Sequence, residues 1–160
     1  MPIQEVKSYL QKFGMDSRVR ELPQSSATVE LAAQALGTQP ARIAKTLSFS
    51  TGEGPVLIVC AGDGKIDNQK YKAFFHQKAK MLSPQEVLDQ VGHPVGDVCP
   101  FAVKEGVRVY LDESLRRFET VFPACGSGNS AIELTLPELE QASGFLQWVD
   151  VCKKAPQEGA

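Results

Sequence analysis

A lysine placed among apolar residues is the first feature of this sequence that could do chemistry. Residues 43–50 (IAKTLSFS) alternate between apolar and polar types, which predicts a half-buried β-strand. Since successive side chains of a strand point to opposite faces, Lys45 shares its face with Ile43, Leu47 and Phe49. An unpaired ammonium on an apolar face costs free energy to desolvate. Lys45 therefore either extends along its stem until the ammonium reaches water, or faces a pocket that binds an anion.

A glycine-rich segment at residues 126–130 is the second candidate site. Its sequence is Gly126-Ser127-Gly128-Asn129-Ser130. Two glycines permit backbone conformations that point successive N–H groups at one anion, such as a phosphate, a carboxylate or a developing oxyanion. The segment lacks Gly-Lys-Ser/Thr and precedes a predicted strand, so it is not a Walker loop. An ordinary hairpin loop, in which Gly and Asn supply positive φ angles, accounts for the same composition.

A third segment, residues 95–101 (VGDVCPF), combines small residues with proline and could line a cleft. Its candidate binding residues are Gly96, Asp97, Pro100 and Phe101. Asp97 could act as a general base, but no second carboxylate lies close to it in the sequence. The alternative is a purely structural connection, because Gly and Pro commonly mark loops.

Lysines interleaved with aromatic residues follow between residues 65 and 80. A lysine row with stackable rings suits an RNA backbone and a splayed base, and Lys65, Lys70 and Lys72 are the candidate tRNA contacts. The alternative is a solvated helix face whose phenylalanines point to the core.

Nucleophilic catalysis by a side chain has little support in the sequence. His76 and His93 are the two histidines, and a Cys–His or Ser–His pair would need one of them beside the nucleophile. His93 precedes Pro94 and is predicted to be a loop residue. No Gly-x-Ser-x-Gly signature occurs.

The length, composition and net charge of the chain limit the class of protein to which it can belong. A chain of 160 residues with 42% hydrophobic and 22% charged residues predicts one globular domain. Its net charge of −2 argues against a broad basic surface for DNA or RNA, but permits a local patch for one RNA end. No segment is apolar enough to predict a membrane span, and residues 1–7 lack a signal-peptide core, so a cytoplasmic location is expected.

The four cysteines are far apart and form no Cys-x-x-Cys motif, so neither a zinc site nor any other metal site is predicted. In a reducing compartment they are expected to be free thiols. They are Cys60, Cys99, Cys125 and Cys152.

The order of predicted elements indicates an α+β domain with a mixed or mostly antiparallel sheet, spanning residues 1–152 and followed by a tail at 153–160. The first helix is predicted at residues 2–13. Four further helices are capped by Thr28, Asp67, Ser83 and Thr135 and end near residues 36, 75, 91 and 143. Strands are predicted at residues 18–22, 43–50, 56–61, 107–111, 119–124, 130–135 and 147–151. The strands at 43–50 and 56–61 are expected to form a hairpin.

Four stretches, taken in their order and spacing, resemble the YbaK/ProX family, the free-standing relatives of the editing domain inserted in bacterial prolyl-tRNA synthetases. They are residues 41–47 (ARIAKTL), 61–67 (AGDGKID), 95–101 and 123–134 (PACGSGNSAIEL). The resemblance covers most of the chain, from about residue 20 to residue 145.

This resemblance implies a single domain around a curved mixed sheet, flanked by helices. It also implies hydrolysis of aminoacyl esters on mischarged tRNA, without a cofactor, and an aminoacyl-tRNA synthetase as a further partner. The essential lysine of the family falls on Lys45, its glycine-rich substrate loop on residues 126–130, and its other pocket loop on residues 96–101. The amino acid removed, whether Ala, Ser, Thr or Cys, stays open.

The expected mechanism needs no protein nucleophile, because a positioned water can attack an ester, with help from the ribose hydroxyl or from the amino acid itself. Lys45 would hold the terminal nucleotide through its phosphate or the ester oxygens, and the backbone N–H groups of residues 126–129 would stabilise the oxyanion. Two alternatives remain: a non-catalytic module that binds tRNA or a nucleotide, and an enzyme for a phosphate ligand.

Overall fold

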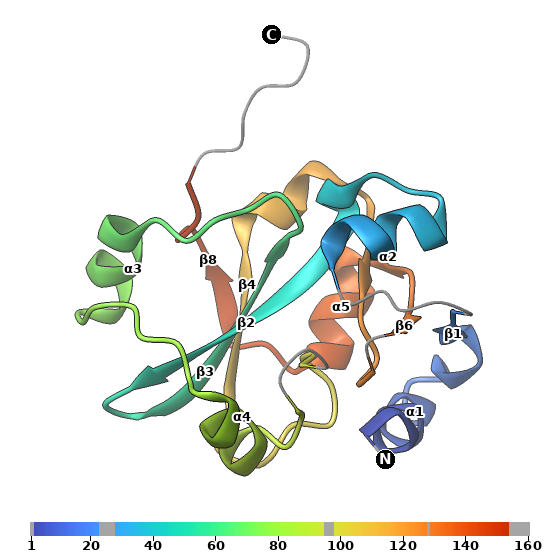
Figure 1. Ribbon diagram of the computed structural model, residues 1–160, viewed down its shortest axis with the longest axis horizontal. Coiled ribbons are helices and arrows are strands. Elements are labelled where there is room, and N and C mark those ends of the chain that lie inside the picture. The colour runs from blue at the N-terminus through green and yellow to red at the C-terminus, as the bar shows by residue number, and fades with distance from the viewer. Residues whose placement is uncertain (1, 23–27, 95–97, 128, 154–160) are drawn as a thin grey trace, which may run out of the picture.

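A six-stranded mixed sheet forms the centre of the molecule (Figure 1). The computed structural model describes residues 2–22, 28–94, 98–127 and 129–153. In spatial order the strands are β7 (Leu134–Thr135), β5 (Thr120–Pro123), β2 (Ile43–Thr51), β3 (Gly54–Ala61), β4 (Arg108–Asp112) and β8 (Gln147–Val149). Neighbouring strands are antiparallel in the pairs β2–β3 and β5–β7 and parallel in the pairs β2–β5, β3–β4 and β4–β8. The predicted mixed sheet is confirmed.

Strands β2 and β3 form the predicted hairpin at the middle of this sheet. Their register pairs Thr51 with Gly54 at the turn and Lys45 with Cys60 near the far end. The apolar run from Val56 to Ala61 is completely buried, as expected of a strand that is covered on both faces.

The helices begin where the sequence supplies caps. Thr28 Oγ1 accepts a hydrogen bond from Leu31 N, and Asp67 caps the next helix through Gln69 N and Lys70 N. The capping boxes predicted at Ser83 and Thr135 are both formed. The helices are α1 (Pro2–Gln11), α2 (Val29–Leu36), α3 (Asn68–Phe75), α4 (Pro84–Gln90) and α5 (Leu136–Ser143), with short 3-10 turns at Asp16–Arg18, Pro40–Arg42 and Glu113–Arg117.

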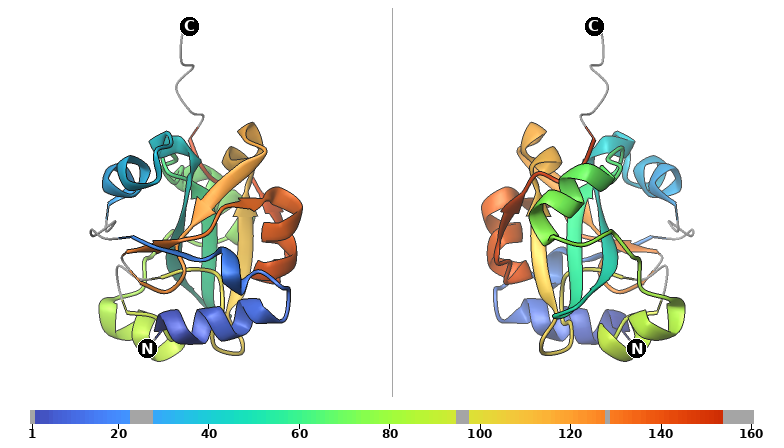
Figure 2. Two further views of the ribbon diagram at one scale, coloured as in Figure 1. Left: turned by 90° about the vertical axis from the view of Figure 1, so that its right-hand side faces the viewer. Right: turned by 90° about the vertical axis from the view of Figure 1, so that its left-hand side faces the viewer.

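The two faces of the sheet carry different helices. Leu57, Val59 and Leu111 project from one face into the main core, which α1, α4 and α5 complete. The opposite face packs against α3 through a second apolar cluster that contains Ile58, and against α2 through a third that contains Ile43. Figure 2 shows α2 and α5 on opposite sides of the sheet. In the described parts of the chain, none of these helices has the length and apolarity needed to cross a bilayer.

The strand predicted at residues 130–135 is divided in the structure. Its first part, β6 (Ser130–Ala131), pairs with β1 (Arg20–Glu21) in a separate two-stranded sheet. Its second part, β7, pairs with β5. The prediction of one continuous strand was therefore wrong, because the two halves bond to different partners.

An ion pair joins the segment after α1 to the start of α5. Arg18 Nη1 lies 2.7 Å from Glu138 Oε2, and Arg18 Nη2 also donates to Glu133 O at 2.6 Å. The Arg18 guanidinium, assisted by the backbone N–H of Thr135, lowers the pKa of Glu138 to about 2. The carboxylate of Glu138 thus serves both the capping box and a contact between distant segments.

Replacing Glu138 should change how stability depends on pH. The folded-state pKa of Glu138 is below its unfolded value, so its contribution is complete above about pH 5 and is lost as pH falls toward 2. Glu138→Gln should reduce the loss of unfolding free energy between pH 6 and pH 3, measured by urea denaturation. Glu105→Gln, at an exposed carboxylate, is the control. An unchanged pH dependence in Glu138→Gln would contradict this assignment.

Candidate functional site

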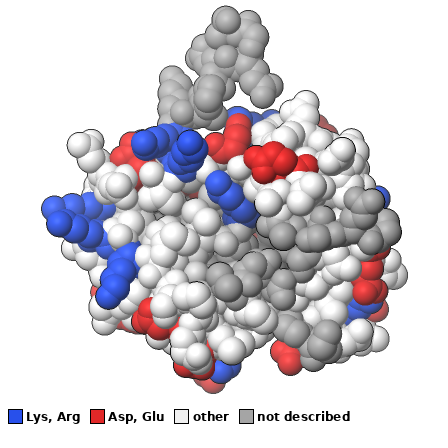
Figure 3. Space-filling model, viewed as in Figure 1, with Lys and Arg blue, Asp and Glu red and all other residues white. Residues whose placement is uncertain are grey.

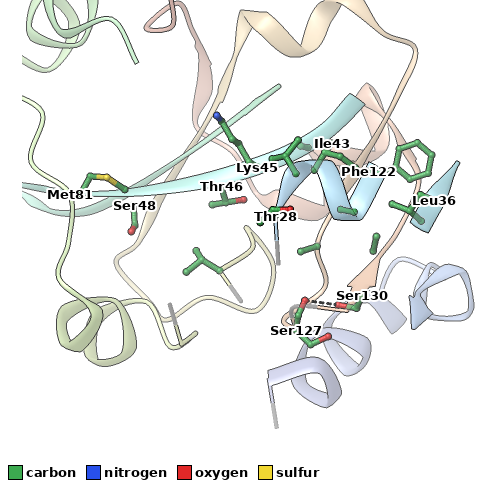
Figure 4. A pocket seen from close by; sticks show the side chains of 16 residues that line it. Thr28, Leu36, Ile43, Lys45, Thr46, Ser48, Met81, Phe122, Ser127 and Ser130 are labelled. Atoms are coloured by element: carbon green, nitrogen blue, oxygen red, sulfur yellow. Dashed lines mark hydrogen bonds between the residues drawn. The ribbon is translucent and has the colours of Figure 1, made fainter. Parts of the chain in front are cut away.

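A pocket of about 230 Å³ lies at one edge of strand β2. We call it the edge pocket. Its walls come from β2, from α2, from the end of β5 with Ala124, and from the glycine loop, by which we mean residues 126–130. Val98 also lines the pocket, and Met81 lies at its rim (Figure 4). Segments far apart in the sequence therefore meet around one short stretch of strand.

The edge pocket exists because β2 has different partners along this edge. Pairing with β5 ends at Ala44, opposite Pro123. Farther along, an isolated bridge joins Phe49 to Met81. Between these two contacts, no strand of the described residues pairs with this edge of β2, and the space beside it is the pocket.

The pocket is lined by side chains from both faces of β2. Ile43 and Lys45 come from the face covered by α2 and α3, whereas Thr46 and Ser48 come from the opposite face. In Figure 4 the amino group of Lys45 points away from Thr46, on the other side of the strand. A ligand in this pocket can therefore contact both faces by lying across the strand edge.

Lys45 occupies the position that the alternation predicted for it. It is half-buried and lies between Ile43, which packs against α2, and Leu47, which packs toward α3. Every other described residue that lines the pocket is uncharged. None of the ion pairs formed by the described residues includes Lys45, so its ammonium is available for an anionic ligand.

The glycine loop forms the wall opposite β2. The side chains of Ser127 and Ser130 line the pocket, and Ser130 is buried. Ser130 Oγ accepts from Cys125 N at 3.2 Å and donates to Ser127 O at 3.2 Å. Gly126 has a φ of 89°, which glycine adopts without strain. Hydrogen bonds internal to the loop thus hold this wall in place.

The other predicted residues of the glycine loop differ in their placement. Asn129 is exposed and does not line the pocket. Its side-chain Nδ2 donates to Leu22 O at 3.2 Å, and its backbone carbonyl oxygen accepts from Leu22 N at 2.6 Å. Asn129 therefore anchors the loop to the segment after β1. Gly128 lies outside the described residues.

The residues of the segment at 95–101 lie in different places. Gly96 and Asp97 lie outside the described residues. Pro100 and Phe101 are buried and do not line the pocket. The ring of Phe101 lies in the main core, 6.5 Å from the ring of Tyr9, because burying an aromatic ring there removes apolar surface from water. Val98 is the described residue of this segment that reaches the pocket.

A buried histidine and cysteine lie side by side, which the sequence reasoning missed. His93 Nε2 is 2.8 Å from Phe101 O and 3.7 Å from Cys99 Sγ. Since a carbonyl oxygen only accepts, Nε2 carries the proton. Both side chains are fully buried and neither lines the pocket. Their contacts join His93 to residues 99–101, which directly follow Val98.

The cysteine thiols are not placed to act as nucleophiles in the pocket. All four are buried, and burial raises the pKa of the Cys125 thiol well above its ordinary value. Among the residues that the structure describes, no three His, Cys, Asp or Glu side chains gather as ligands of a metal ion.

The three lysines predicted to bind tRNA have different surroundings. Lys70 Nζ is 3.0 Å from Asp150 Oδ1 and also donates to Cys152 O at 3.0 Å, so it fastens the segment after β8 to α3. Lys72 and Lys65 are exposed. Lys72 and Lys78 line a hollow beside α3. Figure 3 shows Lys and Arg side chains gathered on the left of this face, over α3.

Several lining residues were not singled out from the sequence. Thr28 was predicted only as a helix cap, yet it also lies at the pocket. Met81, 58% exposed, lies at the rim because its backbone bridges to Phe49. In the sequence Met81 lies just before the helix that Ser83 caps, and no signal there links it to residues 43–50 without knowledge of the pairing.

Removing the Ser130 hydroxyl should destabilise the protein, because the buried N–H of Cys125 loses its acceptor. Ser130→Ala is expected to lower the free energy of unfolding by about 1–3 kcal/mol, measured by urea denaturation. Ser127→Ala, which removes a hydroxyl bonded to the exposed Asn129, should cost less. Equal losses in the two variants would show that Ser130 does not hold the loop.

Known proteins match nearly the whole chain. The sequence model of the family described as the aminoacyl-tRNA editing domain matches residues 24–142. The uncharacterised protein YwhH of Bacillus subtilis is 53% identical over 154 residues, which are 96% of this chain and 98% of YwhH. A proline–tRNA ligase of Thermosipho melanesiensis is 31% identical over 149 residues, which are 91% of this chain but only 26% of the ligase.

Solved structures agree with the sequence matches. A protein described as a proposed trans-editing enzyme for prolyl tRNA synthetase superposes with a TM-score of 0.87 at 28% identity, covering 96% of this chain and 98% of that one. The curved mixed sheet and its flanking helices are shared with it. By the extent of these matches, the chain belongs to the aminoacyl-tRNA editing domain family.

Proposed function

We propose that the protein hydrolyses the ester that joins a small amino acid to the 3′ end of a tRNA. The observation that carries this proposal is the edge pocket, whose described lining has Lys45 as its one charged side chain. The family to which the chain belongs supports the substrate class. The likeness to a proposed trans-editing enzyme and to part of a proline–tRNA ligase supports a mischarged tRNA of the prolyl system.

The pocket favours a small, uncharged amino-acid side chain. Its volume of about 230 Å³ is below the ~300–1,000 Å³ of sites for drug-sized ligands. Ala44, Ala124 and Ala131 contribute small apolar walls, and Thr46, Ser127 and Ser130 contribute hydroxyls. A larger side chain would meet these walls. Exclusion by size discriminates only about 10–200-fold per methylene.

The reaction needs water and no covalent intermediate with the protein. Water adds to the ester carbonyl, the bond between the carbonyl carbon and the ribose oxygen breaks, and the ribose oxygen takes a proton. The products are the free amino acid and the uncharged tRNA. A neighbouring ribose hydroxyl of the substrate can assist the attack, which fits a pocket whose described lining contains no histidine, cysteine or carboxylate side chain.

Lys45 would bind the nucleotide end of this substrate. Its ammonium lies across β2 from Thr46 and Ser48, so it is separated from the wall that suits the amino acid (Figure 4). A lysine ammonium pairs well with a phosphate as a compact point charge. The remainder of the acceptor end would run toward α3, where Lys72 and Lys78 offer charges that form no ion pair among the described residues. With such a substrate, the protein would act in the cytoplasm.

Removing the Lys45 charge should abolish most of the hydrolysis. We expect Lys45→Met, which keeps the apolar stem, to lower kcat/KM for the sensitive aminoacyl-tRNA about 100-fold or more, because one charged contact to the reacting end is lost. The assay follows release of amino acid from tRNA charged with Ala, Ser, Thr or Cys. Lys12→Met, at an exposed lysine of the segment after α1, should keep the wild-type rate.

The outcome of this assay separates the proposal from its alternatives. If wild-type protein hydrolyses none of these esters above the spontaneous rate, the hydrolase proposal fails. Tight tRNA binding without turnover would then support a binding module, and affinity only for small phosphate compounds would support an enzyme for a different ligand.

The lysines beside α3 should contribute to tRNA affinity in a salt-dependent way. Replacing Lys72 and Lys78 together by Met should weaken tRNA binding and reduce the slope of log K against log salt concentration by about 2, because each phosphate contact releases counterions. Lys70→Met is the matched control, since its ammonium is already paired with Asp150 and should affect stability rather than the slope. An unchanged slope in the double variant would remove this surface from the proposed interface.

A further inference from the structure

We propose that the open edge of β2 at Thr46 binds the aminoacyl group as if it were one residue of an antiparallel strand. The donor and the acceptor in this contact are backbone groups, the N–H and C=O of Thr46. This inference rests on the proposed function and adds to it the group that recognises the reacting ester.

Hydrogen bonds that follow Thr46 along β2 show which backbone groups face the open edge. Ser48 O accepts from Leu82 N at 3.2 Å, and Ser50 N donates to Lys80 O at 2.7 Å. Hydrogen-bonding groups of a strand alternate in direction, so the even-numbered residues of β2 face this edge. Thr46 therefore also presents its N–H and C=O to the edge pocket. Among the described residues, no backbone partner meets them there.

The length of the open edge limits the size of the group that can pair with it. Pairing with β5 ends at Ala44, and the next edge contact is made by Ser48. These residues are four positions apart, or about 13 Å along a strand. A typical partner strand of about 5–6 residues is too long for this gap. One amino-acid residue fits opposite Thr46.

An aminoacyl ester carries the two groups that such a position requires. In an antiparallel pair, two opposite residues exchange both of their N–H to C=O hydrogen bonds. The α-ammonium of the ester would donate to Thr46 O, and the ester carbonyl oxygen would accept from Thr46 N–H. Backbone groups that face an open edge are already fixed by the rest of the sheet, so little ordering is needed on binding.

The antiparallel direction also agrees with the positions of the flanking side chains. The ester oxygen and ribose would leave toward the Ala44 end of β2, passing Lys45. Directly opposite residues place their side chains on the same face, so the substrate side chain would lie on the Thr46 face, toward the glycine loop. The nucleotide would then cross to the face that carries Lys45. In this one binding direction, the substrate side chain reaches the pocket wall on the Thr46 face and the nucleotide reaches Lys45 on the other face.

Thr46 N–H would also act during the reaction. When water adds to the carbonyl carbon, negative charge develops on the oxygen that this N–H contacts. The charge is removed again when the bond to the ribose oxygen breaks and that oxygen takes a proton. The backbone group is unchanged at the end and serves as an oxyanion donor on the β2 side of the pocket.

Proline at position 46 tests the backbone donor. Proline lacks an N–H and is tolerated in a strand where that N–H faces an open edge. Thr46→Pro should lower kcat/KM about 100-fold or more, as expected for loss of one oxyanion donor. Thr46→Val removes the hydroxyl but keeps the N–H, so its loss should be at least tenfold smaller.

Gln147→Pro is the matched control for proline in an edge strand. Leu146 N bonds inward to Val109 O, so the N–H of Gln147 faces away from β4 by alternation, far from the edge pocket. This variant should keep the wild-type rate. A folded Thr46→Pro protein, judged by circular dichroism and melting temperature, that hydrolyses its substrate at the wild-type rate would overturn the proposal.

A change in the substrate tests the same contact without altering the protein. Deaminating alanyl-tRNA to its 2-hydroxypropanoyl ester replaces the α-ammonium by a hydroxyl. Wild-type acceleration over the spontaneous rate of each ester should fall about tenfold or more, because a charge-assisted hydrogen bond to Thr46 O is lost. Equal acceleration of both esters would overturn the proposal, even if Thr46→Pro does not fold.

These experiments distinguish failure of this inference from failure of the proposed function. Wild-type protein that releases no amino acid from any ester would overturn both. Active wild-type protein that is impaired by Lys45→Met, but neither by Thr46→Pro nor by deamination of the substrate, would leave the proposed function intact and overturn only the role of Thr46.

Discussion

The backbone N–H and C=O groups along both edges of strand β2 need hydrogen-bond partners. On one of these edges, two different segments of the chain supply them. β5 covers its beginning, and residues 80–82 cover its end. A break between them leaves a donor and an acceptor in the middle of an otherwise paired sheet. Buried backbone groups normally have partners, so this break is either hydrated or reserved for a ligand. The edge pocket, which is lined by side chains from both faces of β2, follows from this one discontinuity.

Local chemistry was sufficient to predict most of the helices and the central hairpin. Thr28, Asp67, Ser83 and Thr135 begin helices because their side-chain oxygens accept from nearby backbone N–H groups, and each of these caps is formed. The face of Lys45 was likewise predictable from a period of two. The division of residues 130–135 was not, because it depends on pairing with β1, more than a hundred residues away in the chain.

The candidate site was predicted less completely than the fold, for a physical reason. Lys45, Ser127 and Ser130 carry side-chain signals in the sequence, and the structure brings them to one pocket. Phe101 was assigned to a binding loop, but its ring gains more by entering the core. The backbone groups of Thr46 could not have been identified, since every residue has such groups and only tertiary pairing decides which remain open. The His93–Cys99 contact was missed because no sequence motif links these two residues, and only the folded chain brings them together.

The most direct test of this account is an NMR titration with an alanyl amide of 3′-amino-3′-deoxyadenosine 5′-monophosphate, which resembles the ester, carries a phosphate for Lys45 and is not hydrolysed. Following backbone amides and lysine ammonium groups would locate the bound analogue on the protein. The account predicts a large shift and slower exchange of the Thr46 amide, together with a shift of the Lys45 ammonium. Saturable binding that perturbs neither group, and shifts only residues beside α3, would contradict it.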